Sequence, residues 1–175
     1  MDHKPLNIIW FCTDQQRWDP THALGNPYLH TPNIDKLIEE GVTFTRAYTQ
    51  APICTPSRSC FLTGRYPRTT KSFFNGNDTF SKDEKLVTKL LADEGYICGL
   101  SGKLHLTSAQ GRMENRTDDG YTYMQWSEHP NDDWPNGEND YQNWLHKKGL
   151  QWADIYGGKY TSMATWPPTP NPNFT

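Results

Sequence analysis

The sequence predicts an α/β protein with a mostly parallel (mixed) sheet flanked by helices. The first observation is that apolar runs at 6–14 and 96–102 have the composition of buried strands. The second is that segments with helical periodicity, at 31–41 and 81–95, alternate with them. The third is the length of 175 residues, which suffices for a sizeable core. Such sheets bind ligands beyond the carboxyl ends of their strands.

The first half of the chain contains four of the expected elements. Residues 6–14 read as a strand that ends at Asp14, and 42–50 alternate imperfectly as a second strand would. A helix is expected over 31–41, with Thr31 as its cap, Pro32 at its first position and Gly41 as a left-handed stop. A short helix is expected from Pro56 to residue 64.

Further along, residues 81–95 predict a helix whose start is a capping box formed by Ser81 and Glu84. A buried strand is expected at 96–102. After about residue 110 the signal weakens, with one plausible helix at 139–148 whose inward residues would be Tyr141, Trp144 and Leu145. The last ten residues resemble turns and polyproline, so the chain is expected to be cut short.

Composition and charge exclude several classes of function. A net charge of −3 gives no basic face for nucleic acid. No run reaches the roughly 18–20 apolar residues of a membrane span, so no membrane association is expected. No signal peptide is evident, which predicts a cytoplasmic protein if Met1 is native, and a periplasmic or secreted one if a signal was removed. The four cysteines show neither disulfide nor zinc spacing.

Candidate functional residues gather where strands end. Cys54 lies at a strand-to-helix turn, where backbone N–H groups and the helix dipole favour an anion, and Arg58 adds a forked cation one turn further in. Asp14 and Gln15 end the first strand and offer oxygen ligands to a cation. Lys103 and His105 follow the last strand; in an extended chain their side chains would point the same way.

Three motifs, in order over residues 6 to 106, resemble the type I sulfatases of the alkaline-phosphatase-like superfamily. "CTPSRSCFLTGRYP" at 54–67 matches their C-x-P-S-R…T-G-R signature. "GYICGLSGKLHL" at 95–106 matches their second signature, with Cys98 in place of the usual threonine, and "NIIWFCTDQQ" at 7–16 is similar to their first strand and metal-ligand turn. The resemblance implies the N-terminal part of a single catalytic domain over 1–175, with its motif-bearing core at 6–106 and a less certain insert and tail at 107–175.

The resemblance implies a sulfuric ester hydrolase in which Cys54 is oxidised to formylglycine by a sulfatase-maturing enzyme. One hydroxyl of the hydrated aldehyde would attack sulfur, and the other would then expel sulfate. Asp14, Gln15 and residue 54 would bind a divalent cation, with Ca²⁺ the first choice and Mn²⁺ or Mg²⁺ as alternatives. Arg58 would hold the formylglycine hydroxyl, Lys103 a sulfate oxygen, and His105 would help to deprotonate the second hydroxyl.

A seventh candidate, Asn75, lies in "SFFNGN", which is similar to a loop that reaches the site in some relatives. It would bind substrate. The substrate would be a sulfated carbohydrate or an aryl sulfate. Tryptophans could stack on its sugar rings, but packing in the core or anchoring of a loop is the favoured role for each of them. Three such tryptophans are Trp126, Trp134 and Trp144. A homo-oligomer is left open.

The chain departs from the family in ways that keep two alternatives open. Many sulfatases have Asp-Asp where this chain has Asp14 and Gln15, and Asp-Gln resembles the phosphonate monoester and phosphodiester hydrolases of the same superfamily. The family's later metal ligands have no convincing counterpart after residue 110, and Asp132 and Asp133 read as a solvated loop. A non-catalytic fragment, which needs the missing C-terminal part, is therefore the other alternative.

Overall fold

The computed structural model describes residues 5–77, 80–108, 114–128 and 139–156. It divides into two compact units, residues 1–48 and residues 49–175, which are described separately below. The expected tail at 166–175 and the pair Asp132 and Asp133 lie outside the described residues, as does Trp134.

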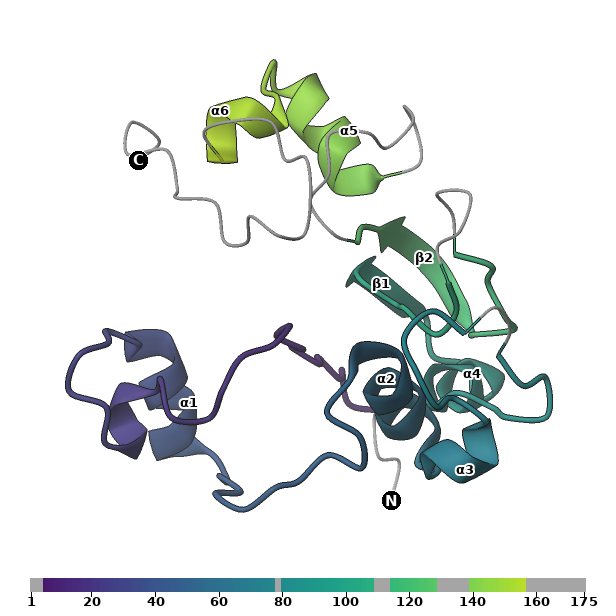
Figure 1. Cartoon of the computed structure of the whole chain (residues 1–175), viewed down its shortest axis with the longest axis horizontal. Helices are drawn as coiled ribbons and strands as arrows, with labels where there is room; N and C mark the ends of the chain where they lie inside the picture. The colour runs from purple at the N-terminus through teal and green to yellow at the C-terminus, as the bar shows by residue number, and fades with distance from the viewer. Residues whose placement is uncertain (1–4, 78–79, 109–113, 129–138, 157–175) are drawn as a thin grey trace. The chain divides into compact units, whose positions relative to one another are not determined.

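The first unit consists of a short 3₁₀ helix, η1 (His22–Leu24), and helix α1 (Pro32–Glu40), shown in Figure 1. Asp35, in the first turn of α1, holds the two together. Its Oδ1 accepts the backbone N–H of Ala23 at 2.9 Å and the hydroxyl of Thr31 at 2.9 Å. The bond from Ala23 is the main reason that the pKa of Asp35 is lowered, and it outweighs the opposing effect of desolvation.

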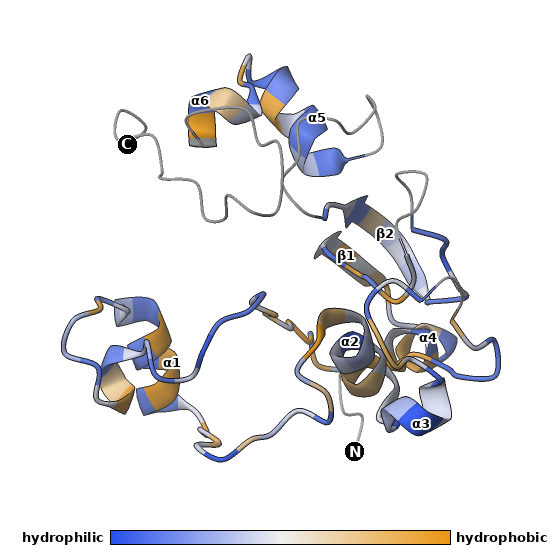
Figure 2. Ribbon diagram, in the orientation of Figure 1, coloured by the Kyte–Doolittle hydropathy of each residue, from blue (hydrophilic) through white to orange (hydrophobic). Residues whose placement is uncertain are grey.

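Helix α1 confirms the prediction over 31–41, but both of its ends differ from expectation. The hydroxyl of Thr31 makes no cap to its own helix; it accepts the backbone N–H of His22 at 2.9 Å instead. Gly41 is extended, with φ −117°, and not left-handed. The helix is amphipathic, as the two colours of α1 in Figure 2 indicate, yet Leu37 on its apolar side is exposed.

The strands predicted at 6–14 and 42–50 are wrong for this structure, which has no strand within the described residues 5–77. Phe11 is 86% exposed and Val42 is 84% exposed. The physical reason is that a continuous apolar strand is stable only when sheet neighbours and covering helices bury it. The described residues of the first unit provide none.

The second unit contains a parallel pair of strands, β1 (Cys98–Gly102) and β2 (Tyr121–Trp126). Gly99 pairs with Tyr123, and the register continues to the pairing of Gly102 with Trp126. The strand expected at 96–102 is thus confirmed, and so is the parallel α/β class. Strand β2 was not predicted, because "YTYMQW" has neither clear alternation nor a continuous aliphatic run.

Five helices accompany the two strands in the described part of this unit. They are α2 (Cys54–Thr63), α3 (Pro67–Thr70), α4 (Val87–Asp93), α5 (Asp140–Lys147) and α6 (Trp152–Tyr156). Helix α2 begins two residues before the predicted start and ends at Gly64, whose left-handed φ of 67° and N–H bond to the Cys60 carbonyl close it. Helix α4 contacts both strands and α2, and α5 contacts β2.

Helix α4 starts six residues later than predicted. Ser81 and Glu84 form a turn, in which the Glu84 N–H donates to the Ser81 carbonyl at 3.3 Å, and not a capping box. Leu86 takes the N-cap position with extended backbone and is fully buried. Burial of this leucine therefore outweighs the local capping signal.

The core of the second unit lies between α2, α4 and the strand pair. Its buried members are Leu62, Phe80, Leu86, Leu104, Leu106 and Trp126. Two of these six, Leu104 and Leu106, come from the loop that follows β1. The core therefore fixes the position of that loop.

Helix α5 confirms the prediction for 139–148, with Asn139 as its cap: the Asn139 side chain accepts the Gln142 N–H at 3.1 Å. Leu145 is buried, as expected. Trp144 is 50% exposed and Tyr141 is 36% exposed, so the expectation that they face inward is wrong. No helix among the described residues has the length and apolar character needed to cross a bilayer.

Candidate active site

Cys54 is the first residue of α2 and carries a free, half-buried thiol. The first turn of α2, which begins at Cys54, offers fewer unpaired backbone N–H groups than the start of a helix usually does. The Thr55 N–H donates to the Asn75 side-chain oxygen at 3.0 Å, Pro56 has no N–H, and the Ser57 N–H donates to the Ile53 carbonyl at 2.9 Å. The expectation of several open N–H groups beside Cys54 is therefore corrected: binding of an anion here has to rest mainly on side chains.

Asn75 lies next to this helix start, in a loop tied to it from both directions. Besides the bond from Thr55 to Asn75, the Gly76 N–H donates to the Thr55 hydroxyl at 3.3 Å. The side-chain oxygen of Asn75 thus acts as a cap for α2. Whether Asn75 also binds substrate stays a prediction.

Arg58 joins helix α2 to the loop after β1. The side chain is buried, and its Nη1 donates to the Lys103 carbonyl at 2.7 Å. Arg58 is one turn from Cys54, so this bond brings the two motifs that carry Cys54 and Lys103 to one place in the fold. A buried guanidinium at this place raises the local electrostatic potential.

The loop after β1 places His105 between two core residues. Leu104 and Leu106 are 2% and 1% exposed, and His105 itself is buried. His105 has a left-handed backbone, with φ 55°, which a non-glycine residue adopts only where the surroundings hold it. The chain is therefore not extended here, and the argument that Lys103 and His105 point the same way because they are two residues apart is wrong.

Glu114 holds this loop and was not found from the sequence. Its carboxyl oxygens accept the backbone N–H groups of His105 at 2.7 Å and Thr107 at 2.9 Å, and also that of Leu106. The indole N–H of Trp126 donates to the same group at 3.4 Å. Burial raises the pKa of Glu114, and the bonds from the backbone lower it back in part.

Glu128 contacts the imidazole of His105 and was also missed. Its Oε1 lies 3.3 Å from His105 Nε2, and the two side chains are 4% and 9% exposed. Glu128 lies just after the end of β2. It was missed because the sequence analysis did not predict this strand. Polar residues that directly follow a parallel strand are candidates for a site, so Glu128 becomes one once β2 is known to end at Trp126.

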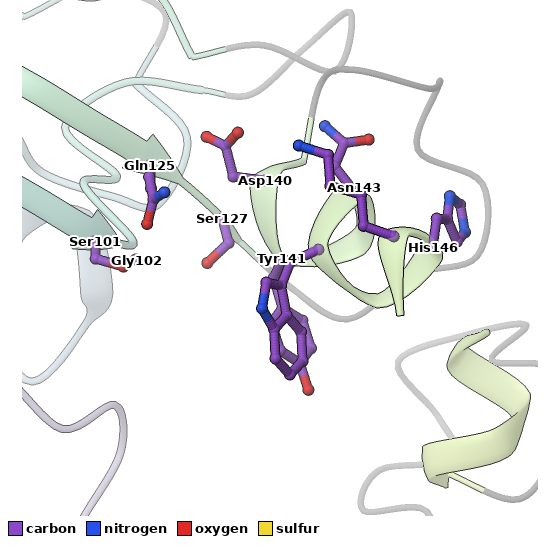
Figure 3. Close-up of a pocket in the computed structure, with 10 residues that line it drawn as sticks. Ser101, Gly102, Gln125, Ser127, Asp140, Tyr141, Asn143 and His146 are labelled. Atoms are coloured by element: carbon purple, nitrogen blue, oxygen red, sulfur yellow. The ribbon is translucent and has the colours of Figure 1, made fainter. Parts of the chain in front are cut away.

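A cavity of about 870 Å³ lies at the carboxyl ends of the two strands, beside α5. Figure 3 shows Ser101 and Gln125 on the strand side, and Asp140 and Asn143 on the helix side. The strands contribute Ser101, Gly102, Gln125 and Ser127; helix α5 contributes Asp140, Tyr141, Asn143, Trp144, His146 and Lys147. Gly102 directly precedes Lys103, so the cavity continues the edge of the sheet at which the candidate residues lie.

Two aromatic rings of this cavity are stacked on each other. The ring centroids of Tyr141 and Trp144 are 5.9 Å apart with an angle of 15° between their planes. The Lys148 ammonium lies 6.0 Å from the centre of the Trp144 ring. Hydrogen-bonding side chains beside exposed aromatic faces suit a polar ligand that also has apolar surface.

The candidate cation ligands Asp14 and Gln15 belong to the first unit. Both are exposed, and Gln15 has a left-handed φ of 55°. A carboxylate and an amide oxygen are suitable donors for Ca²⁺, which takes six to eight oxygens. Among the residues that the structure describes, no group of three or more His, Cys, Asp or Glu side chains gathers as a metal site. Asp14 and Gln15 therefore supply part of a cation site at most, and their approach to Cys54 stays a prediction.

The family model for "Sulfatase" matches residues 6–165, which is most of the chain. The chain belongs to the sulfatase family. An ulvan-active sulfatase of Formosa agariphila is 41% identical to it over 101 residues, covering 57% of this chain and 19% of that protein. Human steryl-sulfatase is 39% identical over 110 residues, again covering 57% of this chain and 19% of that protein. This sulfatase chain thus spans about a fifth of the length of the curated relatives it matches.

The fold of the sulfatase chain is also found in a solved structure. The phosphonate monoester hydrolase of Agrobacterium radiobacter matches with a TM-score of 0.62, covering 83% of this chain and 30% of that protein. At 24% identity this match shows a shared fold alone.

Proposed function

We propose that the protein hydrolyses sulfate monoesters, with a formylglycine made from Cys54 as its reactive group. The observation that carries the proposal is the bond from Arg58 to the Lys103 carbonyl, because it joins the two signature segments of the sulfatase family. This bond places four groups in one part of the second unit: the nucleophile position at residue 54, the cations of Arg58 and Lys103, and the imidazole of His105. These are the groups that transfer of a charged sulfuryl group requires.

The residues of the chain divide this task between them. The formylglycine would supply, once hydrated, one hydroxyl that attacks sulfur and a second that allows sulfate to leave. Arg58 would orient the first hydroxyl, and the Lys103 ammonium would bind a sulfate oxygen and balance its charge. His105 would accept the proton of the second hydroxyl, which is the role of a general base.

A divalent cation completes the proposal, with Asp14 and Gln15 among its ligands. Their oxygens suit Ca²⁺ first, and Mn²⁺ or Mg²⁺ as well. The cation would polarise the sulfate oxygens. The roles given to Arg58, Lys103 and His105 do not depend on which of these cations is bound.

The cavity beside α5 favours a sulfated carbohydrate over an aryl sulfate. Seven of the ten residues that line it are Ser, Gln, Asp, Asn, His or Lys, and hydroxyl-rich rings need such partners. The exposed ring of Trp144 offers a face on which the carbon side of a pyranose can pack. Family members named for ulvan and for steryl substrates differ widely, so the support for a sugar comes from this cavity.

The decisive experiment compares the full-length wild-type protein, produced together with a sulfatase-maturing enzyme and supplied with Ca²⁺, with its Cys54→Ala variant. The tryptic peptide 47–58 of the wild type should be about 18 Da lighter than its unmodified mass, and sulfate release should fall to background in the variant. Cys98→Thr is the control: it changes another thiol, keeps a donor for the Thr88 carbonyl that Cys98 contacts, and should keep activity. Equal sulfate release by wild type and Cys54→Ala would refute the proposal.

The same preparation can be assayed on sulfate monoesters and on phosphate diesters, the alternative substrates that Gln15 suggests. A preference of more than tenfold in kcat/KM, or about 1.4 kcal/mol of barrier, assigns the substrate class. Preference for the diester would move the protein to the phosphodiesterase branch with the same residues in the same roles.

A further inference from the structure

His105 is held from two sides by buried carboxyl groups that come from separate segments of the chain. Glu114 accepts its backbone N–H at 2.7 Å, while Glu128 lies 3.3 Å from its ring nitrogen Nε2. The first contact fixes where the residue sits, and the second fixes how its ring is turned. Each carboxyl therefore has a distinct task.

The position of Glu128 follows from the pairing of the strands. The Ser127 N–H donates to the Gly102 carbonyl at 3.0 Å, which continues the β1–β2 ladder by one step beyond the strands. Glu128 therefore leaves the sheet next to the loop that follows Gly102. Two residues of that loop, Leu104 and Leu106, are buried on either side of His105, so the imidazole has little freedom to turn away.

The contact also selects the tautomer of the imidazole. A neutral imidazole carries its proton on one nitrogen and accepts hydrogen bonds on the other. Glu128 can only accept, when ionised, so the proton of the neutral ring belongs on Nε2 and Nδ1 becomes the basic nitrogen. A neighbouring carboxylate also stabilises the imidazolium that forms when Nδ1 takes up a proton.

A purely structural role is the simpler interpretation of a buried pair of this kind. Buried ion pairs are weak evidence for stability, since desolvation of both charges offsets their attraction. What favours function here is the location: the pair lies at the carboxyl edge of parallel strands, on the loop that also carries Lys103 and receives the bond from Arg58.

We propose that Glu128 is a positioning residue that holds His105 as the Nε2–H tautomer, which leaves the buried Nδ1 as the ring nitrogen that can accept a proton in the reaction. This inference rests on the proposed function for its catalytic meaning, but the tautomer can be observed without any turnover. Glu128 itself touches neither the substrate nor the reacting atoms in this assignment.

The test is Glu128→Gln in the full-length protein, matured as above. Glutamine keeps the shape of the side chain and an acceptor oxygen but removes the charge. The tautomer is read from the ¹⁵N chemical shifts of histidine-labelled protein, in which the signal of His105 is assigned with a His105→Gln sample. Glu84→Gln is the matched control, because Glu84 pairs with Arg65 at 3.7 Å and its side chain is 14% exposed.

We expect the wild type to show Nε2–H at His105, and Glu128→Gln to lose that preference. On a sulfate ester, kcat should fall by about 10- to 100-fold with KM within about twofold, which is the usual scale for a group that orients a functional side chain. Glu84→Gln should match the wild type in both readouts. A role in folding alone would lower the amount of folded protein and leave kcat per folded molecule unchanged.

Four results would count against the inference or against part of it. A wild-type ring protonated on Nδ1, or a spectrum that Glu128→Gln leaves unchanged, would overturn it whatever the activity. An altered tautomer with unchanged kcat would overturn the catalytic meaning. The expected spectra in a wild type that hydrolyses no sulfate ester would overturn the proposed function, and the role in catalysis with it, while the pairing of Glu128 with His105 stands.

Discussion

Glu114 is a buried carboxyl group that accepts hydrogen bonds from four N–H donors of the described residues: three consecutive backbone groups and the Trp126 indole. Such a set of donors suits the ionised form, whereas burial disfavours it. Desolvation is the larger effect and raises the pKa of Glu114 above its ordinary value of 4.5. The loop that carries His105 is therefore held by a group that titrates.

This raised pKa sets the sign of a pH dependence. A carboxyl with a raised folded-state pKa contributes its full stability below pH 4.5, and that contribution is lost as the pH rises through the folded-state pKa. We expect the free energy of unfolding of the wild type, relative to Glu114→Gln, to fall as the pH is raised from about 4 to about 7. Urea denaturation of both proteins at each pH measures it, and a difference that grows with pH would contradict the expected direction.

The residues that could be predicted were those in signature segments. Cys54, Arg58, Lys103 and His105 stand in such segments, and the structure brings Arg58 and Lys103 into contact. Glu114 and Glu128 could not be predicted, since each is a single acidic residue in a segment without periodicity. Their significance depends on a loop conformation, with φ 55° at His105, that local sequence does not encode.

At the scale of elements, the contact between α4 and the start of β2 depends on a glycine. Gly120 has a left-handed φ of 79°, and a Cβ placed on it would come within 2.5 Å of the Lys89 Cα in α4. The Thr88 hydroxyl also donates to the Asp119 carbonyl at 2.6 Å. The backbone at 119–120 is thus pressed against the helix.

Gly120→Ala should therefore destabilise the protein by two effects, a strained φ of about 1–2 kcal/mol and a steric clash of about 1–3 kcal/mol. Gly64→Ala is the control for the first effect alone, since Gly64 has φ 67° and no atom lies within 4 Å of the place that its added methyl group would take. Chemical denaturation should show a clearly larger loss for Gly120→Ala. Equal losses of stability in the two variants would mean that α4 shifts to accommodate the added methyl group.

Helix α5 separates a cavity face from a core face within two neighbouring residues. Trp144 is 50% exposed beside the cavity, and Leu145 is 1% exposed. Trp144→Ala should weaken binding of a sulfated oligosaccharide by about 1 kcal/mol or more while the melting temperature changes little. Leu145→Ala should cost about 2–5 kcal/mol of stability. Calorimetric titration and thermal denaturation measure the two, and unchanged sugar affinity in Trp144→Ala would argue against a sugar at this cavity.

The elements differ in how far local sequence predicts them. Strand β1 and helices α1, α2 and α5 follow from periodicity and from proline or glycine at their ends. Helix α4 begins late because Leu86 is needed in the core, and Trp144 turns outward although its spacing fits an inward face. In both cases packing between elements, which one sequence does not display, decides the outcome.

At the scale of the whole molecule, the two units differ in how much apolar surface they bury. Residues 49–156 include the core around Leu86 and Trp126, whereas the apolar side chains at 6–11 and 42–48 are mostly exposed. Large apolar side chains that are exposed in contiguous patches usually mark contacts with another part of a protein or a partner. The two wrong strand predictions fall on these same segments.

Amide hydrogen exchange tests this difference directly. In the 175-residue chain, amides at 6–14 and 42–50 should exchange at nearly unprotected rates, because they make no ladder of hydrogen bonds, while those of β1 and β2 exchange slowly. Mass spectrometry of peptides after a series of labelling times provides the rates. Slow exchange at 6–14 and 42–50 would mean that both segments form strands in solution, as the sequence predicts.

The start of α2 affects how well the protein would distinguish one inhibitory anion from another. A fixed ring of backbone N–H donors distinguishes oxyanions by their shape and by the number of their oxygens. At the start of α2 such a ring is incomplete, because Pro56 lacks an N–H and the N–H of Thr55 already donates to Asn75. The Lys103 ammonium acts as a compact point charge and responds chiefly to the charge of an anion. We therefore expect free sulfate and other dianions of similar size to compete with one another on nearly equal terms, and background electrolyte to weaken all of them together.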